Sequence, residues 1–128
     1  MDSGAIRRGL ALGLTVLTAS GLIALASPGH AQAADFCSGR KVRTLSFSTG
    51  SVGIYRNDGY VCAVTVATRV SGRQAMSVSV QARGSRPVAD VGRYTHHAGP
   101  VVVHAGHRCV WVRGSVGPGS VSSGWILC

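Results

Sequence analysis

Four histidines lie close together in the segment YTHHAGPVVVHAGHRC, which runs from Tyr94 to Cys109. Imidazole binds transition metals and exchanges protons near neutral pH, so metal or acid–base chemistry would most readily arise here. His104 and His107 flank the dipeptide Ala105-Gly106, which is typical of a turn between two strands. If that turn is a two-residue hairpin, the two histidines face each other with Cβ atoms about 4.5–5.5 Å apart and could share a metal ion.

A functional metal site would need more than this pair. Such a site requires a third protein ligand and hydrogen-bonded neighbours that orient the imidazoles. His96 and His97 are adjacent in the sequence, so on a strand they point to opposite faces and cannot both join the site. We therefore predict exposed polar residues beside a loop, with no metal ion and no cofactor. His104 and His107 remain candidates for contacting a ligand.

Few other side chains in the sequence could act as catalytic groups. The sequence contains no glutamate, which the common microbial ribonucleases pair with histidine, so a ribonuclease would have to use His97 or His104 with a nearby arginine. Glycoside hydrolysis needs two carboxylates about 5–9.5 Å apart. Asp58 belongs to a turn signal and Asp35 lies near the N-terminus, which leaves only Asp90. Gly-x-Ser-x-Gly is absent from the sequence. We predict no enzymatic activity and no catalytic residues.

The elements that hold these residues are predicted to be strands. In MSVSVQA, Met76 to Ala82, apolar and polar residues alternate, and YVCAVTVAT, Tyr60 to Thr68, alternates in the same way. RTLSFST and SVGIYR precede them, and Asp58-Gly59 is a strong hairpin signal. VSGRQ and GSRP mark further turns. This spacing predicts an all-β fold, a small antiparallel sandwich or barrel of about seven to nine strands.

The N-terminal sequence is typical of an export signal. Two arginines precede an apolar run from Leu10 to Ala26, and AQA then offers the small residues that a signal peptidase recognises. We predict cleavage after Ala33, which makes residues 1–33 a signal peptide and residues 34–128 one mature domain. An uncleaved membrane anchor is the alternative, but Pro28 and Gly29 break the run. The general secretory route is favoured over the twin-arginine route.

The sequence has four cysteines, Cys37, Cys62, Cys109 and Cys128. An even number in a short exported chain is typical of disulfides, whereas zinc sites use closer pairs such as Cys-x-x-Cys. Of the three possible pairings we favour Cys37–Cys62 with Cys109–Cys128, because each joins neighbours in the sequence.

The mature chain is strongly basic. The full chain has 13 Lys and Arg against 4 Asp and Glu, and removing the signal peptide leaves a net charge of about +8. Such a charge favours attachment to anionic cell-wall or spore-surface polymers through salt-screened attraction. Ten of the mature cations are arginines, a bias that GC-rich genomes also produce, so no specific nucleic-acid partner is predicted. No membrane anchor is expected after cleavage.

Carbohydrate recognition would use aromatic side chains. Trp111 and Trp125 are predicted to lie in the core, because a domain with seven aromatic residues needs them inside. Tyr55 and Tyr94 are freer to be exposed and are candidates for contacting a ligand.

From Cys37 to Cys128 the chain resembles the spore-associated protein A family of filamentous actinobacteria. The likeness is carried by VGRYTHHAGPVVVHAGHRCVWVRGSVG and by GYVCAVTVATR. Members have similar Gly-x-Tyr-Thr, Ala-Gly-Pro-Val and Cys-x-x-Trp-like motifs, although here a single residue separates Cys109 from Trp111. The resemblance implies secretion and association with the spore or cell surface, and it brings no catalytic residues.

Together these observations predict a secreted, non-enzymatic structural protein of the cell or spore surface. The alternative is a binding module for cell-wall polysaccharide or another polyanion. A small secreted hydrolase or a protease inhibitor is less favoured. An inhibitor would need a rigid exposed loop braced by a cysteine, and the GSRPV loop has none nearby.

Overall fold

In the computed structural model, residues 36–128 are described, so the predicted signal peptide lies outside the described residues. This part of the chain forms eight strands. Their bounds are β2 Arg40–Phe47, β3 Gly50–Asn57, β4 Tyr60–Ala67, β5 Gln74–Ala82, β6 Val88–Tyr94, β7 His97–His104, β8 Val110–Val116 and β9 Gly119–Ile126. Within the described residues, no helix has the length and apolar character needed to cross a membrane.

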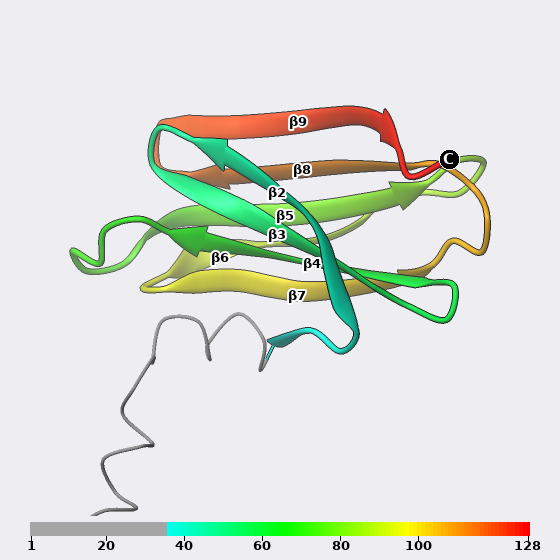
Figure 1. Ribbon diagram of the computed structural model, residues 1–128. Coiled ribbons are helices and arrows are strands. Elements are labelled where there is room, and N and C mark those ends of the chain that lie inside the picture. The colour runs from blue at the N-terminus through cyan, green and yellow to red at the C-terminus, as the bar shows by residue number, and fades with distance from the viewer. Residues whose placement is uncertain (1–35) are drawn as a thin grey trace, which may run out of the picture. The chain divides into compact units, whose positions relative to one another are not determined.

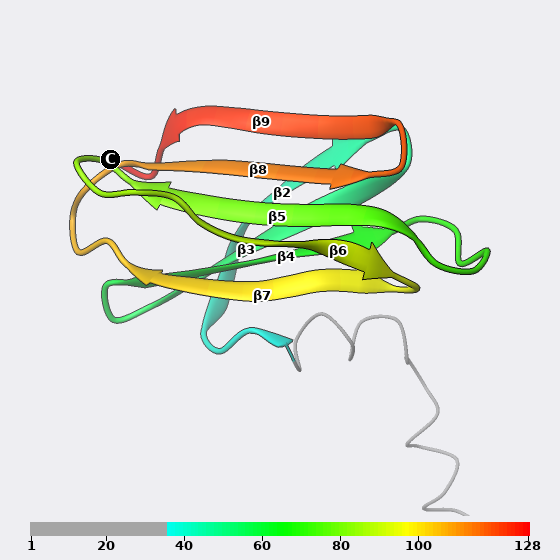
Figure 2. The same cartoon turned by 180° about the vertical axis from the view of Figure 1, so that it is seen from behind.

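The strands make two four-stranded antiparallel sheets (Figure 1). The first has the order β2-β3-β4-β7 and the second β6-β5-β8-β9. The sheets pack face to face, as the view from behind also shows (Figure 2), and the chain crosses between them after β4, β6 and β7. The prediction of an all-β fold with antiparallel sheets is confirmed, and its layers are those of a sandwich.

The turn between β3 and β4 follows from its sequence. Asp58 and Gly59 both adopt positive φ, 48° and 84°, as the two central residues of a tight hairpin turn require. Glycine reaches this conformation without strain, and aspartate tolerates it better than most residues. The predicted Asp58-Gly59 hairpin is confirmed, and Asn57 pairs with Tyr60 across it.

The core between the sheets is built mainly from alternate residues of β3, β4, β5, β7 and β8. On β5, Met76, Val78, Val80 and Ala82 are buried, while the intervening Ser77, Ser79 and Gln81 are half-buried on the outer face. The predicted alternation of β5 is therefore confirmed. The buried core residues are Val52, Ile54, Val61, Ala63, Ala67, Met76, Val78, Val80, Ala82, Ala98, Val101, Ala105, Val110, Val112 and Val116.

Strand β4 is buried on both faces, which alternation alone does not show. Its inward residues join the main core, whereas Cys62 and Val64 point outward and are also buried. A second cluster covers them, made with Cys37 and Tyr55. The segment before β2 therefore lies against the outer face of the first sheet.

The two disulfides join Cys37 to Cys62 and Cys109 to Cys128, so the favoured pairing is confirmed. The first bond ties the segment before β2 to β4 of the first sheet. The second ties the residue before β8 to the residues after β9 in the second sheet. Each sheet thus has a covalent link of its own.

The two sheets approach closely at Gly114 of β8. A Cβ atom at this position would collide with Val52 of β3 and with the hydroxyl of Thr65 on β4. Thr65 is fully buried, and its hydroxyl has no hydrogen-bond partner within the described structure. A side chain larger than hydrogen at position 114 would therefore have to push the sheets apart.

Candidate functional site

The strands on the two sides of Ala105-Gly106 belong to different sheets. β7 belongs to the first sheet and β8 to the second, so the predicted hairpin that would place His104 opposite His107 is wrong. The amides of Ala105 and Gly106 both donate to the carbonyl of Gly59, at 2.9 Å. These bonds hold the connection beside the β3–β4 turn and direct the chain to the other sheet.

Both histidines nevertheless border one surface cavity of about 590 Å³. Its lining is Arg56, Asp58, Gly59, His104, Gly106 and His107. The Arg56 guanidinium donates to the Gly106 carbonyl at 3.5 Å, and the His104 ring meets the Tyr60 ring edge-on with centroids 4.9 Å apart. In residues 36–128 no three His, Cys, Asp or Glu side chains form a group that could hold a metal ion. The cavity brings one guanidinium and two imidazoles together with the Asp58 carboxylate.

Arg108 fastens the loops at this end of the molecule. Its Nη2 donates to the His104 carbonyl at 2.8 Å and its Nε to the Ala105 carbonyl at 3.1 Å. Its Nη1 reaches the Arg83 carbonyl at 3.2 Å and the Ser85 hydroxyl at 3.0 Å. The guanidinium therefore links the β7–β8 connection to the β5–β6 loop, and we assign it a structural role.

The two tyrosines proposed as ligand contacts are differently placed. Tyr55 is 5% exposed, because it packs on the outer face of the first sheet beside Cys62 and Val64. The ammonium of Lys41 lies 5.7 Å from the Tyr55 ring centre. The expectation that Tyr55 is exposed is wrong, because the segment before β2 covers the face on which it lies.

Tyr94 is half-buried and engaged with Asp90 of the same strand. Its hydroxyl donates to one carboxylate oxygen of Asp90, and the other accepts from the Gly99 amide at 2.8 Å. The hydrogen bond to Asp90, then burial and the carboxylate charge, raise the pKa of Tyr94. Asp90, the carboxylate left unassigned by the sequence, thus fastens β6 to β7.

His97 begins β7 and stacks on Phe36, with ring centroids 3.9 Å apart and planes inclined by 18°. Burial lowers the pKa of His97, and the neighbouring His96 lowers it further, while Asp90 acts in the opposite direction. The ring is held neutral by desolvation, which disfavours its charged form.

This lowered pKa gives a pH-dependent stability. An unfolded histidine titrates at about pH 6.5, so below that pH the unfolded chain binds more protons than the folded one. The stability that neutral His97 contributes is present above about pH 6.5 and is lost as the pH falls through the folded value. We expect the melting temperature to fall between about pH 7.5 and pH 5, and to fall less in His97→Phe, which keeps a ring against Phe36. An equal fall in both proteins would contradict this role of His97.

The tryptophans are not in the core, contrary to the prediction. Trp111 and Trp125 lie opposite each other on β8 and β9, half-buried on the outer face of the second sheet. Their rings meet edge to face, with centroids 5.3 Å apart, and the Trp111 indole donates to the Ser122 hydroxyl at 2.7 Å. The signal was in VWVRGSV itself, because Val110 and Val112 point inward and Trp111 must then point outward.

An arginine lies over each tryptophan ring. The Arg83 guanidinium carbon is 4.9 Å from the centre of the Trp125 ring, and that of Arg113 is 5.2 Å from the centre of the Trp111 ring. Both arginines are exposed. We call these four residues the Trp–Arg face. Sequence reasoning missed it because it assigned the tryptophans to the interior.

No side-chain carboxylate of residues 36–128 pairs with the arginines of this face. The side-chain carboxylates of the described residues are Asp58 and Asp90. Asp58 lies in the β3–β4 turn, and Asp90 bonds to Tyr94 and Gly99. The Trp–Arg face is therefore cationic, and the Arg83 carbonyl accepts a hydrogen bond from Arg108 of the β7–β8 connection.

Comparison of the chain with protein-family models, with curated proteins and with solved structures found no match.

Proposed function

We propose that this protein is secreted, has no enzymatic activity, and works as a structural component that adheres to anionic polymers at the cell or spore exterior. The observation that carries the proposal is the unbalanced cationic surface. Of the lysine and arginine side chains in residues 36–128, all are exposed except Arg56, which is half-buried. The two side-chain carboxylates of that part lie on other elements, Asp58 in the β3–β4 turn and Asp90 on β6.

Two further observations support this function. Small domains held by disulfides are typical of oxidising, extracellular surroundings, and this domain has one bond in each sheet. The resemblance to the spore-associated protein A family, carried by the residues quoted above, implies the same location. Attraction between many exposed cations and a dense anionic polymer needs no shaped pocket, and it weakens with salt because the screening length is about 8 Å at physiological ionic strength.

A second candidate is a binding module for cell-wall polysaccharide or another polyanion. The Trp–Arg face favours it, because half-buried tryptophans on an outer sheet face offer a sugar both apolar surface and hydrogen-bonding edges. The two candidates are compatible, since a surface protein can attach through general charge and through one specific site.

Fractionation of the producing cells tests the first proposal. We expect the native protein in the wall or spore-coat fraction at about 0.05 M salt, with release at about 1 M salt and no release by non-ionic detergent. The triple variant Arg40→Gln, Arg43→Gln, Arg69→Gln removes three exposed charges outside the Trp–Arg face and should be released at lower salt. Native protein that stays free in the culture fluid at low salt, or that only detergent releases, would contradict the proposal.

A further inference from the structure

We propose that the Trp–Arg face is a binding site for an acidic polysaccharide whose sugar rings carry carboxylates. The sugar rings would pack on the indole surface that the overlying arginines leave open, and the carboxylates would pair with Arg83 and Arg113. The proposal rests on the proposed function only in placing the protein where such polymers occur.

The tryptophan pair is fixed before any ligand arrives. The hydrogen bond from the Trp111 indole to Ser122 sets the orientation of one ring, and the edge-to-face contact with Trp125 sets the other. The two lie directly opposite each other on neighbouring strands, so both project from the same face of a rigid sheet. A ligand therefore meets half-buried aromatic surface without having to order it, which reduces the entropic cost of binding.

The two arginines are similarly prepared. The contact to the ring is made with the guanidinium carbon above it, and the N–H groups around that carbon can still donate two parallel hydrogen bonds to a carboxylate. Within residues 36–128 the Arg113 guanidinium makes no hydrogen bond, and that of Arg83 makes a single long contact, 3.9 Å, to the Cys109 sulfur. Their donors are therefore available to an anion.

Polar side chains continue the face along the sheet. Gln81 pairs in register with Trp111, and Ser79 and Ser122 pair with Arg113 on its two sides. All three lie on the outer face, where amide and hydroxyl groups can exchange hydrogen bonds with sugar hydroxyls. The face thus combines apolar, polar and cationic groups, which together match an acidic sugar chain.

Charge and ring geometry select this ligand over its competitors. A neutral polysaccharide would leave the Arg83 and Arg113 charges without partners. Single-stranded nucleic acid binds by stacking successive bases on aromatic rings, and the rings of Trp111 and Trp125 stand at 88° to each other. A chain of carboxylated sugars needs no row of parallel rings.

Tryptophan fluorescence tests the proposal, because the sequence has two tryptophans and both belong to this face. The full protein, as exported, is titrated with oligogalacturonate, with neutral dextran oligomers and with poly-L-glutamate. We expect a saturable fluorescence change with oligogalacturonate alone. Arg113→Gln, which keeps both tryptophans as reporters, should weaken binding about tenfold or more, because one charge-assisted pair is lost.

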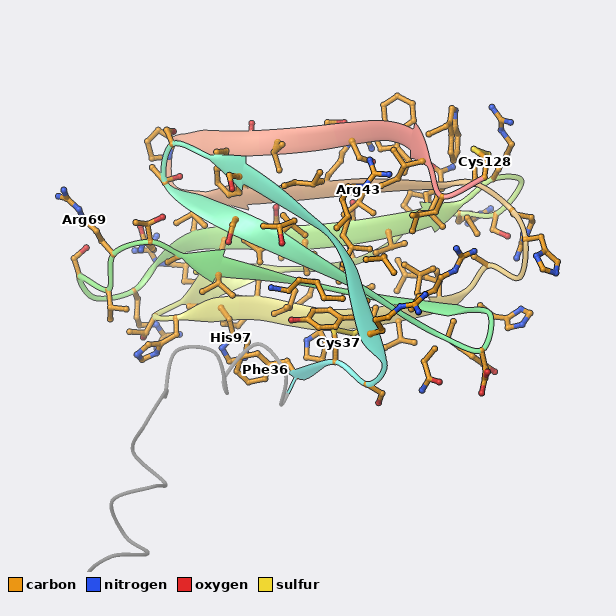
Figure 3. All side chains as sticks on the ribbon, in the orientation of Figure 1. Phe36, Cys37, Arg43, Arg69, His97 and Cys128 are labelled. Atoms are coloured by element: carbon orange, nitrogen blue, oxygen red, sulfur yellow. A yellow bond between two sulfur atoms is a disulfide. The ribbon has the colours of Figure 1, made fainter. Side chains whose placement is uncertain are left out.

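Arg69→Gln is the matched control. Arg69 is exposed and lies at the end of the molecule opposite Cys128, whose disulfide partner precedes β8 (Figure 3). The control variant loses the same charge, so we expect its affinity for oligogalacturonate to change by less than about twofold. Circular dichroism of each variant verifies that it is folded. Equal weakening by both variants would show that net charge alone attracts the ligand, and would overturn the site.

The other ligands give further ways to overturn it. An equal response to poly-L-glutamate would show that the face does not recognise sugar rings. An equal response to dextran would show that it does not recognise carboxylates. Tighter binding of a single-stranded oligodeoxynucleotide would assign the face to nucleic acid. Retention on walls that persists in Arg113→Gln, without any oligogalacturonate response in the native protein, would leave the proposed function standing and refute this site. Oligogalacturonate binding by a protein that walls do not retain would support this site and refute the proposed function.

Discussion

Reduction of both disulfides is expected to lower the free energy of unfolding by about 6–8 kcal/mol. The bonds close loops with sequence separations of 25 and 19 residues, and the chain-entropy relation gives about 3–4 kcal/mol for each. Small domains have total stabilities of about 5–15 kcal/mol, so reduction should remove a large share of the net stability and lower the melting temperature sharply.

Denaturant titration of the oxidised and reduced protein measures this effect. The double variant Cys37→Ala, Cys62→Ala separates the first bond from the second, and its expected loss is about 3–4 kcal/mol. Alanine is used because Cys37 and Cys62 are 4% and 5% exposed, and a hydroxyl there would lack partners. Unchanged unfolding midpoints under reductant would show that the sheets alone hold the domain together.

Gly114→Ala is expected to lower the free energy of unfolding by about 3 kcal/mol, although alanine normally stabilises a strand relative to glycine. The added methyl would overlap Val52 and the hydroxyl of Thr65 from the facing sheet. All three positions are buried within the sandwich, so the sheets themselves would have to move. For a domain of this size the corresponding fall in melting temperature is about 12–24 °C.

Two variants show whether overcrowding is the cause. Ser115→Ala changes the next residue of β8, which is half-buried and bonds to the Ser77 hydroxyl at 2.6 Å, and it should cost about 1 kcal/mol. Val52→Ala creates room opposite Gly114, so adding Gly114→Ala to it should cost less than adding Gly114→Ala to the native protein. If the two costs are equal, the effect of Gly114→Ala does not come from contact with Val52.

The parts of the fold that were predictable are those that local residues determine. The Asp58-Gly59 turn follows from two residues that accept positive φ, and the buried face of β5 follows from strict alternation between Met76 and Ala82. The cysteine pairing followed from proximity in the sequence, which here matches proximity in each sheet.

The errors came from partners that are distant in the sequence. Ala105-Gly106 looks like a hairpin turn, but its amides bond to Gly59 of another hairpin, so β7 pairs with β4 and β8 with β5. Tyr55 looked exposed because nothing local indicates that the segment around Cys37 covers it.

The candidate site was partly within reach of the sequence. The inward valines of β8 place Trp111 and Arg113 outside, so alternation along β8 contained the information for this half of the Trp–Arg face, although the prediction placed Trp111 in the core. The contribution of Arg83 was not predictable, because it reaches Trp125 from the end of β5 across β8. Such a contact depends on the order of strands in the sheet, which residue spacing does not contain.

The two disulfides anchor the two ends of the domain to different sheets, and this decides where a reporter group can be attached. Cys37 is fixed to the outer surface of the first sheet, whereas Cys128 is fixed beside Trp111 and Trp125 on the second. A fluorescent label or affinity handle joined ahead of Phe36 would lie on the side of the first sheet and leave the tryptophans accessible to ligand. The same handle joined after Cys128 would crowd them, so immobilisation for surface-binding assays should proceed from the N-terminal side.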